Sequence, residues 1–302
     1  MENIRGRFLP SVQTMELMHP LAQSCSIAEA AARLSDLGYY RSIETAVLCD
    51  RALSARMYNI CAGTGLRWTC WASPFINAEA LNISSLDREV WERSLERLTE
   101  LLKTTADAGA NAFSILSGRK PEAAGKLPEA LRRLEEGMLR LADCAAGYPQ
   151  FSLFIEPLDR DVHKCGTLGT SQEAAALIEK VRLVHPKTAI VWDSAHFSLQ
   201  EGDLSKSLRT CGGVIGHIHL CNAILQQNAP LYGDYHIMPG GRGYLHADFA
   251  ARLLVEAAAI LPDSEAIPLA VEARAQSDTW QTEAEIRHFL ERVFTLAEEL
   301  TG

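Results

Sequence analysis

Four residues whose side chains can bind a divalent cation stand at the ends of short apolar segments. Glu156 ends Phe-Ser-Leu-Phe-Ile-Glu, Asp193 ends Thr-Ala-Ile-Val-Trp-Asp, and Glu272 ends Leu-Ala-Val-Glu. His219 ends Gly-His-Ile-His, which lies between Asp193 and Glu272 in the chain. A single acid at such a place is ordinarily solvated or caps a helix. Four metal-competent residues in succession indicate one shared site.

Three carboxylates that converge on one point repel one another. At least one of them must take up a proton unless a cation neutralises them. One divalent metal ion bound by Glu156, Asp193, His219 and Glu272 meets this requirement. Such an oxygen-rich set with one imidazole favours Mn²⁺, and Mg²⁺, Co²⁺ and Zn²⁺ are the alternatives.

Two further histidines lie close to this set in the sequence. On a strand, His217 and His219 point to the same face, because they are two residues apart. We expect His219, nearer the C-terminal end, to reach the cation, and His217 to be a buried, hydrogen-bonded interior residue. His196 follows Asp193 by three residues. It is a candidate for substrate contact, for supporting a metal ligand, or for binding a second metal ion.

A long glycine-rich segment after the seventh apolar segment carries Asp234, His236 and Arg242. Glycines let backbone N–H groups approach a ligand closely, and an arginine can hold a hydroxyl, carboxylate or phosphate group. Long loops of this kind tend to be functional. His163 lies in the charged segment after the fifth apolar segment, where the mouth of a site is expected. We assign these four residues and His196 to substrate binding.

Three other groups of residues each have two interpretations. Glu44, in the second apolar segment, either reaches into the site or pairs with a neighbour. Charged residues near His163 either line the mouth of the site or form an exposed loop; they are Arg160, Asp161 and Lys164. Aromatic residues after the third apolar segment form either a wall for a sugar ring or part of the core; they are Trp68, Trp71 and Phe75.

Eight apolar segments alternate with amphipathic helices along the chain, and this alternation must position the candidate residues. The predicted strands are residues 7–12, 42–48, 67–72, 112–116, 151–155, 188–192, 214–219 and 267–271. The predicted helices are residues 26–37, 51–61, 87–108, 128–145, 171–184, 204–211, 247–261 and 283–300. Thr170 with Glu173, and Thr282 with Glu285, have the spacing of a capping box.

The fold class follows from this alternation. The later strands are apolar throughout, which is typical of a parallel sheet covered by helices. Eight strand–helix units in 302 residues match a single (β/α)8 TIM barrel, of class α/β, as one domain over residues 1–302. The alternative, a doubly wound sheet, usually has a glycine-rich turn after the first strand, where this chain has Gln-Thr-Met-Glu. Barrel sites lie at the C-terminal ends of strands, so this fold brings the four candidate ligands together.

Composition excludes several classes of protein. The chain is 47% hydrophobic and 22% charged, as in soluble globular proteins and unlike disordered chains. It has no run of about 18 uninterrupted apolar residues, so no membrane span is expected. A net charge of −9 argues against a nucleic-acid partner. Eight cysteines without Cys-x-x-Cys spacing, and an N-terminus without an apolar signal segment, predict reduced thiols and a cytoplasmic protein.

Taken together, the motifs resemble those of a known superfamily. They are Glu-Pro-Leu-x-Arg from Glu156, Asp-x-x-His from Asp193, Gly-His-x-His ending in His219, and Val-Glu ending in Glu272. In this order and spacing they resemble the xylose isomerase-like barrels, which include sugar isomerases and epimerases and the DNA-repair enzyme endonuclease IV. The resemblance implies that these four residues bind one divalent ion. As in tagatose 3-epimerase-like members, it implies that the catalytic residues Glu156 and Glu272 also carry protons, and that His196 lies near the substrate.

The chain also departs from individual members of that superfamily. Asp234-x-His236 resembles the pair that holds an additional zinc in endonuclease IV. That enzyme has further metal-binding histidines after strands two to four, whereas residues 71–75 and 114–118 here contain none. Members like tagatose 3-epimerase have an acid and an arginine at about the places where this chain has Val162 and Leu225. The resemblance therefore does not imply DNA cleavage or a close ketose 3-epimerase.

These observations predict a divalent-metal-dependent isomerase or epimerase of a sugar, polyol or keto-sugar, acting by proton abstraction α to a carbonyl through a metal-stabilised enediolate. The main alternative is a dehydratase or lyase on a keto-sugar or inosose, with His163 or His196 as the acid. A phosphodiesterase like endonuclease IV and a non-catalytic binding barrel are further alternatives. The expected partner is a small-molecule carbohydrate, with no nucleic acid and no membrane. Barrels of this type often associate, so a homo-oligomer is an open alternative to a monomer.

Overall fold

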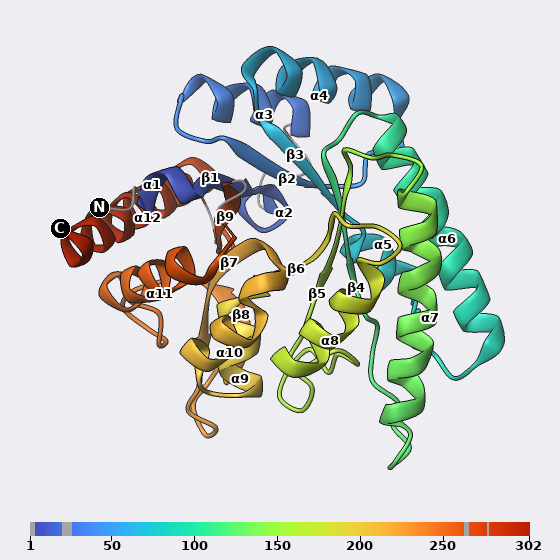
Figure 1. Cartoon of the computed structure of the whole chain (residues 1–302). Coiled ribbons are helices and arrows are strands. Elements are labelled where there is room, and N and C mark those ends of the chain that lie inside the picture. Colours follow the sequence, from blue (N-terminus) through green and yellow to red (C-terminus); the bar gives the residue numbers. More distant parts are fainter. Residues whose placement is uncertain (1–3, 20–25, 263–265, 277) are drawn as a thin grey trace.

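The computed structural model describes residues 4–19, 26–262, 266–276 and 278–302. In this part of the chain, eight parallel strands close into a barrel with helices between successive strands (Figure 1). The barrel strands are β1 (Phe8–Gln13), β2 (Ser42–Ala46), β3 (Arg67–Trp71), β4 (Ala112–Leu116), β5 (Ser152–Glu156), β6 (Thr188–Asp193), β7 (Ile215–Ile224) and β9 (Ile267–Glu272). The predicted (β/α)8 TIM barrel is confirmed. That all 302 residues form one domain stays a prediction.

The pairing of β7 closes the barrel and also aligns the candidate ligands. β7 pairs in parallel with β6 on one side and with β9 on the other, and β9 pairs with β1. The register places Asp193 of β6 beside His219 of β7. It places Glu272 of β9 beside Cys221, two residues further along β7. The hydrogen-bond ladder therefore brings three of the four ligands within two residues of one another in register at the C-terminal end of the barrel.

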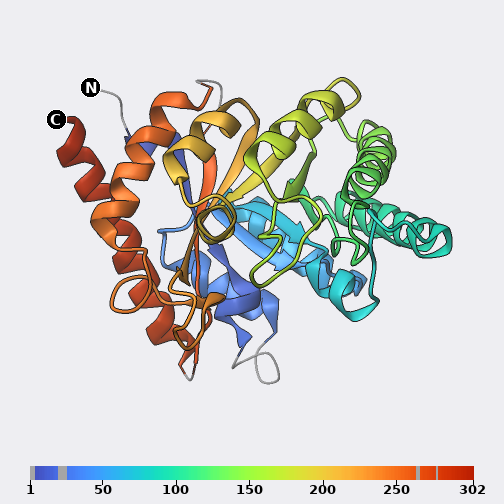
Figure 2. The same ribbon diagram turned by 90° about the horizontal axis from the view of Figure 1, so that it is seen from below.

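The helices lie around the outside of the strands, as Figures 1 and 2 show from two directions. Long amphipathic helices occupy the predicted places, and they are α3 (Ile27–Asp36), α4 (Arg51–Thr64), α6 (Arg88–Asp107), α7 (Leu127–Ala145), α8 (Ser171–Val181), α10 (Leu204–Cys211), α11 (Ala247–Ile260) and α12 (Thr279–Thr301). Short helices were not predicted from the sequence, and they are α1 (Ile4–Arg7), α2 (Thr14–Leu17), α5 (Ser73–Ala78) and α9 (Ser194–Gln200).

One of the two predicted capping boxes is present. Thr170 Oγ1 accepts the N–H of Glu173, and Glu173 Oε2 accepts the N–H of Thr170. The box at Thr282 is wrong, because α12 begins three residues earlier and Asp278 Oδ1 accepts its first free N–H groups. An aspartate at the N-cap satisfies the same donors, so the later threonine lies inside the helix.

The segment after the seventh barrel strand differs from the prediction. β7 continues to Ile224 instead of ending at His219, and β8 (Gly233–Ile237) returns antiparallel to it. The predicted long loop therefore contains a hairpin. The segment that follows β8 is held by Asn222 of β7, whose Nδ2 donates to the carbonyl oxygens of Met238 and Arg242. This hairpin brings residues of β8 back over the end of the barrel.

The buried apolar residues form several clusters, and two of them are the largest. The larger of these two lies between the strands and the surrounding helices and includes Trp68, Phe113 and Phe294. A smaller apolar cluster packs separately and consists of Trp71, Ala112, Phe154, Ala189 and Val191. Because Ala189 and Val191 alternate along β6 with outward-facing residues, they share the face of Asp193 and lie inside the barrel. This apolar interior lies beneath the candidate site.

The described residues bear on two predictions, the absence of a membrane span and the presence of reduced thiols. No helix among them is long and apolar enough to cross a membrane. The described cysteines are free, in agreement with the predicted thiols, and Cys25 lies outside the described residues. The cytoplasmic location stays a prediction.

The barrel interior leaves no room for a side chain at Gly216, at the base of β7. A Cβ there would lie 2.6 Å from Ala189 Cβ and 2.8 Å from Phe154 Cε1. We expect Gly216→Ala to lower the free energy of unfolding by about 1–3 kcal/mol through overpacking. Urea unfolding measures this, with Gly213→Ala as the control, since a Cβ at Gly213 meets nothing within 4 Å. Equal stabilities of the two variants would contradict the packing argument.

Candidate metal centre and active site

Glu156, Asp193, His219 and Glu272 come together at the C-terminal ends of β5, β6, β7 and β9. One ligand atom from each lies within 4.8 Å of those of the others. His219 Nδ1 is 2.9 Å from Glu272 Oε2, 3.5 Å from Glu156 Oε1 and 3.9 Å from Asp193 Oδ2. Each of the four residues is at most 8% exposed. The structure therefore brings all four sequence-predicted ligands into one buried group.

The ligand atoms of this group lack the partners that buried polar atoms normally have. Glu156 Oε1, Asp193 Oδ2 and His219 Nδ1 make no hydrogen bond to the described residues. Leaving such an atom unpaired costs about 1–3 kcal/mol, and more for a charged group. Asp193 Oδ1 accepts the N–H groups of Ala195 and His196 at the start of α9, which turns Oδ2 toward the group. Three carboxylates and one imidazole with free, converging donor atoms fit one divalent ion.

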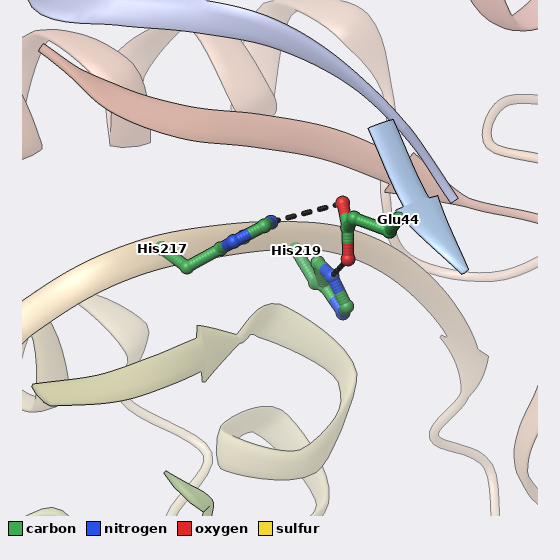
Figure 3. A group of neighbouring side chains, drawn as sticks. All are labelled: Glu44, His217 and His219. Atoms are coloured by element: carbon green, nitrogen blue, oxygen red, sulfur yellow. Dashed lines mark hydrogen bonds and ion pairs between the residues drawn. The ribbon is translucent and has the colours of Figure 1, made fainter. Parts of the chain in front are cut away.

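Glu44 lies inside the barrel and binds His219 from the side away from this group (Figure 3). Its Oε2 accepts from His219 Nε2 and Trp71 Nε1, both at 2.9 Å. Its Oε1 accepts from His217 Nε2 at 3.0 Å and Ser11 Oγ at 2.8 Å. With Nε2 of His219 directed at Glu44, Nδ1 is the nitrogen left to bind a cation in the ligand group, as in carboxylate–histidine–metal arrangements.

These contacts settle several open interpretations of the sequence. Glu44 pairs with two histidines and supports the candidate metal ligand. His217 is the buried, hydrogen-bonded interior residue that was predicted. The aromatic residues divide between both roles: Trp71 stacks on His219 with ring centroids 5.2 Å apart and lines the site, whereas Trp68 is buried in the core and donates to Thr45.

Burial and neighbouring charges shift the pKa values of the carboxyl groups at this site. Burial raises the pKa of Asp193 to about 7; His196 opposes this shift, and Glu156 and Glu272 reinforce it. Burial would raise the pKa of Glu44 too, but the two histidines bound to it hold that pKa well below its usual value. Without a cation, Asp193 therefore holds a proton near neutral pH, as expected for crowded carboxylates.

A cavity of about 300 Å³ opens above the ligand group. Glu156, His219 and Glu272 form part of its lining, and His196, His236 and Lys164 contribute polar groups. Larger hollows among the described residues, such as one of about 530 Å³ along α6, do not contain the ligand group. The candidate active site is therefore the smaller cavity at the end of the barrel, which the ligand group borders.

The sequence-assigned substrate residues divide into two sets. His196 and His236 line the cavity, and Asp234 is buried against His236, with 3.0 Å between its Oδ2 and His236 Nε2. His163 does not line the cavity, since its ring stacks on Tyr235 with centroids 4.3 Å apart.

Arg242 also lies outside the cavity. It is exposed and lines a separate surface hollow with Leu225 and Tyr244. Asn222 of β7 holds the carbonyl group of Arg242 in the segment that follows β8.

Gln13, Glu16 and Arg274 are among the cavity residues that sequence reasoning missed. Gln13 Nε2 donates to Glu272 Oε1 at 3.2 Å, Glu16 Oε1 lies 3.1 Å from His236 Nδ1, and the Nε of Arg274 donates to Glu16. Gln13 and Glu16 follow the first barrel strand directly, and Arg274 follows Glu272. The rule that located the four ligands, at the C-terminal ends of strands, would also have located these residues.

Comparisons with known proteins agree with this architecture. A family model described as xylose isomerase-like TIM barrel matches residues 31–257, which is more than half of the chain. No curated protein matches the sequence.

Many solved structures share the fold, and three illustrate the likeness. An L-ribulose 3-epimerase has a TM-score of 0.73 and 18% identity, with 97% of each chain covered. D-psicose 3-epimerase from Clostridium cellulolyticum H10 has 0.70 and 15%, covering 96% of this chain and 99% of that one. An IOLI protein with a zinc atom has 0.72 and 14%, covering 97% of this chain and 99% of that one. At these identities the likeness establishes the fold.

The Glu44 contacts predict an effect on cation binding from inside the barrel. In Glu44→Gln, an amide N–H₂ can face His219 Nε2, which favours the tautomer with its hydrogen on Nδ1, toward the ligand group. We expect the affinity for Mn²⁺ to fall about 10–100-fold, measured by titration calorimetry. Glu283→Gln is the matched control, since Glu283, on α12, is also buried and accepts a hydrogen bond from Tyr40. Unchanged affinity in Glu44→Gln would show that Glu44 does not orient His219.

The raised pKa of Asp193 predicts a pH-dependent effect of the cation on stability. Without a cation, the folded state binds this proton more tightly than the unfolded state does, so the stabilisation is present at low pH and is lost as pH rises through about 7. A cation replaces the proton. We expect the increase in Tm caused by Mn²⁺ to grow between about pH 5.5 and pH 8, because the metal competes with the proton. Thermal melts with Mn²⁺ and with EDTA measure it, and a pH-independent increase would contradict it.

Proposed function

The chain belongs to the xylose isomerase-like TIM barrel family, and from this we propose that it is a divalent-metal-dependent isomerase or epimerase of a sugar, polyol or keto-sugar. The observation that carries the proposal is the convergence of Glu156, Asp193, His219 and Glu272 below one cavity. Solved neighbours named as sugar epimerases, and one that contains zinc, support it. A cavity of about 300 Å³ suits a small carbohydrate.

A divalent ion on these ligands would act as a Lewis acid, holding adjacent carbonyl and hydroxyl oxygens and stabilising the charge that develops on them. The oxygen-rich ligand set favours Mn²⁺ for this role. The protein holds the ligands ready: Asp193 is oriented by the N–H groups of α9, and His219 by Glu44.

The two glutamates supply the proton transfers that we propose. They come from β5 and β9, which lie on opposite sides of the β6–β7 pair, so they approach the cavity from two sides. Glu156 makes no hydrogen bond to the described residues through its buried Oε1. Glu272 Oε1 is held by Gln13. One carboxylate removes the proton α to the carbonyl, and the other returns a proton to the opposite face or to the neighbouring carbon.

A dehydratase or lyase that uses the same cavity is the second candidate, and the placement of His196 favours it. His196 Nδ1 lies 3.3 Å from Asp159 Oδ2, which leaves Nε2 facing the cavity and Asp234. An imidazole held in this way can donate a proton to a departing hydroxyl group. His163, the other acid considered from the sequence, lies outside the cavity. Among the described residues, no histidine stands in β2, β3 or β4, so the ligands for an endonuclease IV-like reaction are lacking there.

Exchange in heavy water separates these candidates. The chain loaded with Mn²⁺ is incubated with a panel of keto-sugars in D₂O, and products are analysed by mass spectrometry and NMR. An isomerase or epimerase introduces deuterium at carbon without loss of water, whereas a lyase produces a dehydrated product. Neither exchange nor dehydration with any member of the panel would contradict the proposed function.

Replacing one proton-carrying glutamate tests the assignment of roles. Glu272→Gln keeps the shape of the side chain but removes one of the two proton-carrying groups, so we expect a folded protein whose turnover falls about 10²-fold or more in the same assay. Glu256→Gln on α11 is the control, since Glu256 pairs with Arg209 away from the cavity. Turnover within a factor of about two of the unchanged protein would remove Glu272 from the mechanism.

A further inference from the structure

Asp234 and His236, which can both bind a metal ion, lie beside the first ligand group. The ammonium group of Lys164 contacts both of them. Asp234 is fully buried. Its Oδ2 is 3.0 Å from His236 Nε2 and 3.8 Å from His196 Nε2. A buried carboxylate with imidazole nitrogens on one side is a donor set that suits Zn²⁺ or Mn²⁺. The ammonium group of Lys164 lies at this place, 2.9 Å from Asp234 Oδ2 and 3.1 Å from His236 Nε2.

We propose that Lys164 is a built-in cation that fills a second cation-binding position formed by Asp234 and His236, and thereby limits the cavity to one divalent ion. This inference rests on the proposed function, which places that one ion on the neighbouring ligand group. The donor set of Asp234 and His236 is satisfied by an ammonium group from the chain itself, so a second metal ion is excluded by charge and by space.

The chain builds this position from both sides. On one side, Asp159 is buried and Oδ1 accepts the backbone N–H groups of His163 and Lys164, which fixes the turn that carries the lysine into the cavity. On the other side, His236 Nδ1 faces Glu16 Oε1 at 3.1 Å, which turns Nε2 toward Lys164. The ammonium group therefore meets the Asp234 carboxylate and lies beside an imidazole ring that Glu16 holds in place.

Burial distinguishes this ion pair from the lysine pairs on the surface. The side chain of Lys164 is 28% exposed and that of Asp234 is 0% exposed, whereas Lys120 pairs with Asp161 at 32% and 70%. Burial alone would lower the pKa of Lys164, but the Asp234 carboxylate outweighs it and raises that pKa, so the amine is charged at neutral pH. Removing the ammonium leaves a buried carboxylate that a cation from solution can neutralise.

Counting metal ions tests the inference. The full chain is equilibrated with excess Mn²⁺, gel-filtered and analysed for manganese by mass spectrometry. We expect one ion per chain in the unchanged protein and one additional ion in Lys164→Met, which keeps the aliphatic stem but lacks the charge. Lys164→Gln serves as a second neutral variant should the methionine variant fold poorly. Lys164→Arg retains a cation and should keep one ion, as should the surface control Lys120→Met.

Location is tested by a double variant. Lys164→Met with Asp234→Asn should return the count to one, because the second ion would lose its carboxylate. An unchanged count in both neutral variants would overturn the inference, as would a second ion that survives Asp234→Asn or two ions in the unchanged protein. A count of none in the unchanged protein would contradict the proposed function, while a gain of one ion in Lys164→Met would still support the role of Lys164.

Discussion

Electrostatic repulsion among buried carboxylates is the constraint on which the rest of this structure depends. Glu156, Asp193 and Glu272 lie around one imidazole at the end of the barrel, each almost inaccessible to water. Such an arrangement is stable only with a proton or a cation among the three groups. The raised pKa of Asp193 means that this carboxyl group takes up the proton when no cation is bound. The parallel register of β6, β7 and β9 holds Asp193, His219 and Glu272 together, so the backbone pairing of the barrel maintains this repulsion.

The barrel interior takes part in this arrangement and does not merely support it. Glu44 accepts hydrogen bonds from Ser11, Trp71, His217 and His219 at a fully buried place in the barrel. A buried charge persists at such a place only when it is fully hydrogen-bonded. The same carboxylate fixes the ring of His219, so a polar network in the core determines which nitrogen reaches the ligand group. The hydrogen bonds of Glu44 therefore both stabilise the barrel interior and orient the ring of His219.

Most of the fold and the four ligands were predictable because each depends on a local rule. Apolar strands alternate with amphipathic helices, and barrel sites lie where strands end. The rest depends on pairings across the chain. β8 was missed because Gly233–Ile237 carries polar residues and gains its strand conformation from β7. Arg242 was placed in the site because the turn held by Asn222 cannot be read from composition. The partners of Glu44 follow from the barrel's closure, and its sequence neighbours do not indicate them.

The hairpin of β7 and β8 makes the two halves of the cavity unequal. On the β5 side, Glu156 faces the cavity with a buried oxygen that the described residues leave without a partner. On the β9 side, Glu272 is held by Gln13, and His236 lies 3.5 Å from its Oε1, itself held between Glu16 and Asp234. Two glutamates at equivalent strand ends therefore have different surroundings. Under the proposed function, this difference in surroundings would separate a carboxylate that accepts a proton from one that returns it. The asymmetry arises from Gln13 at the end of β1 and from His236 of β8, an element outside the eightfold repeat.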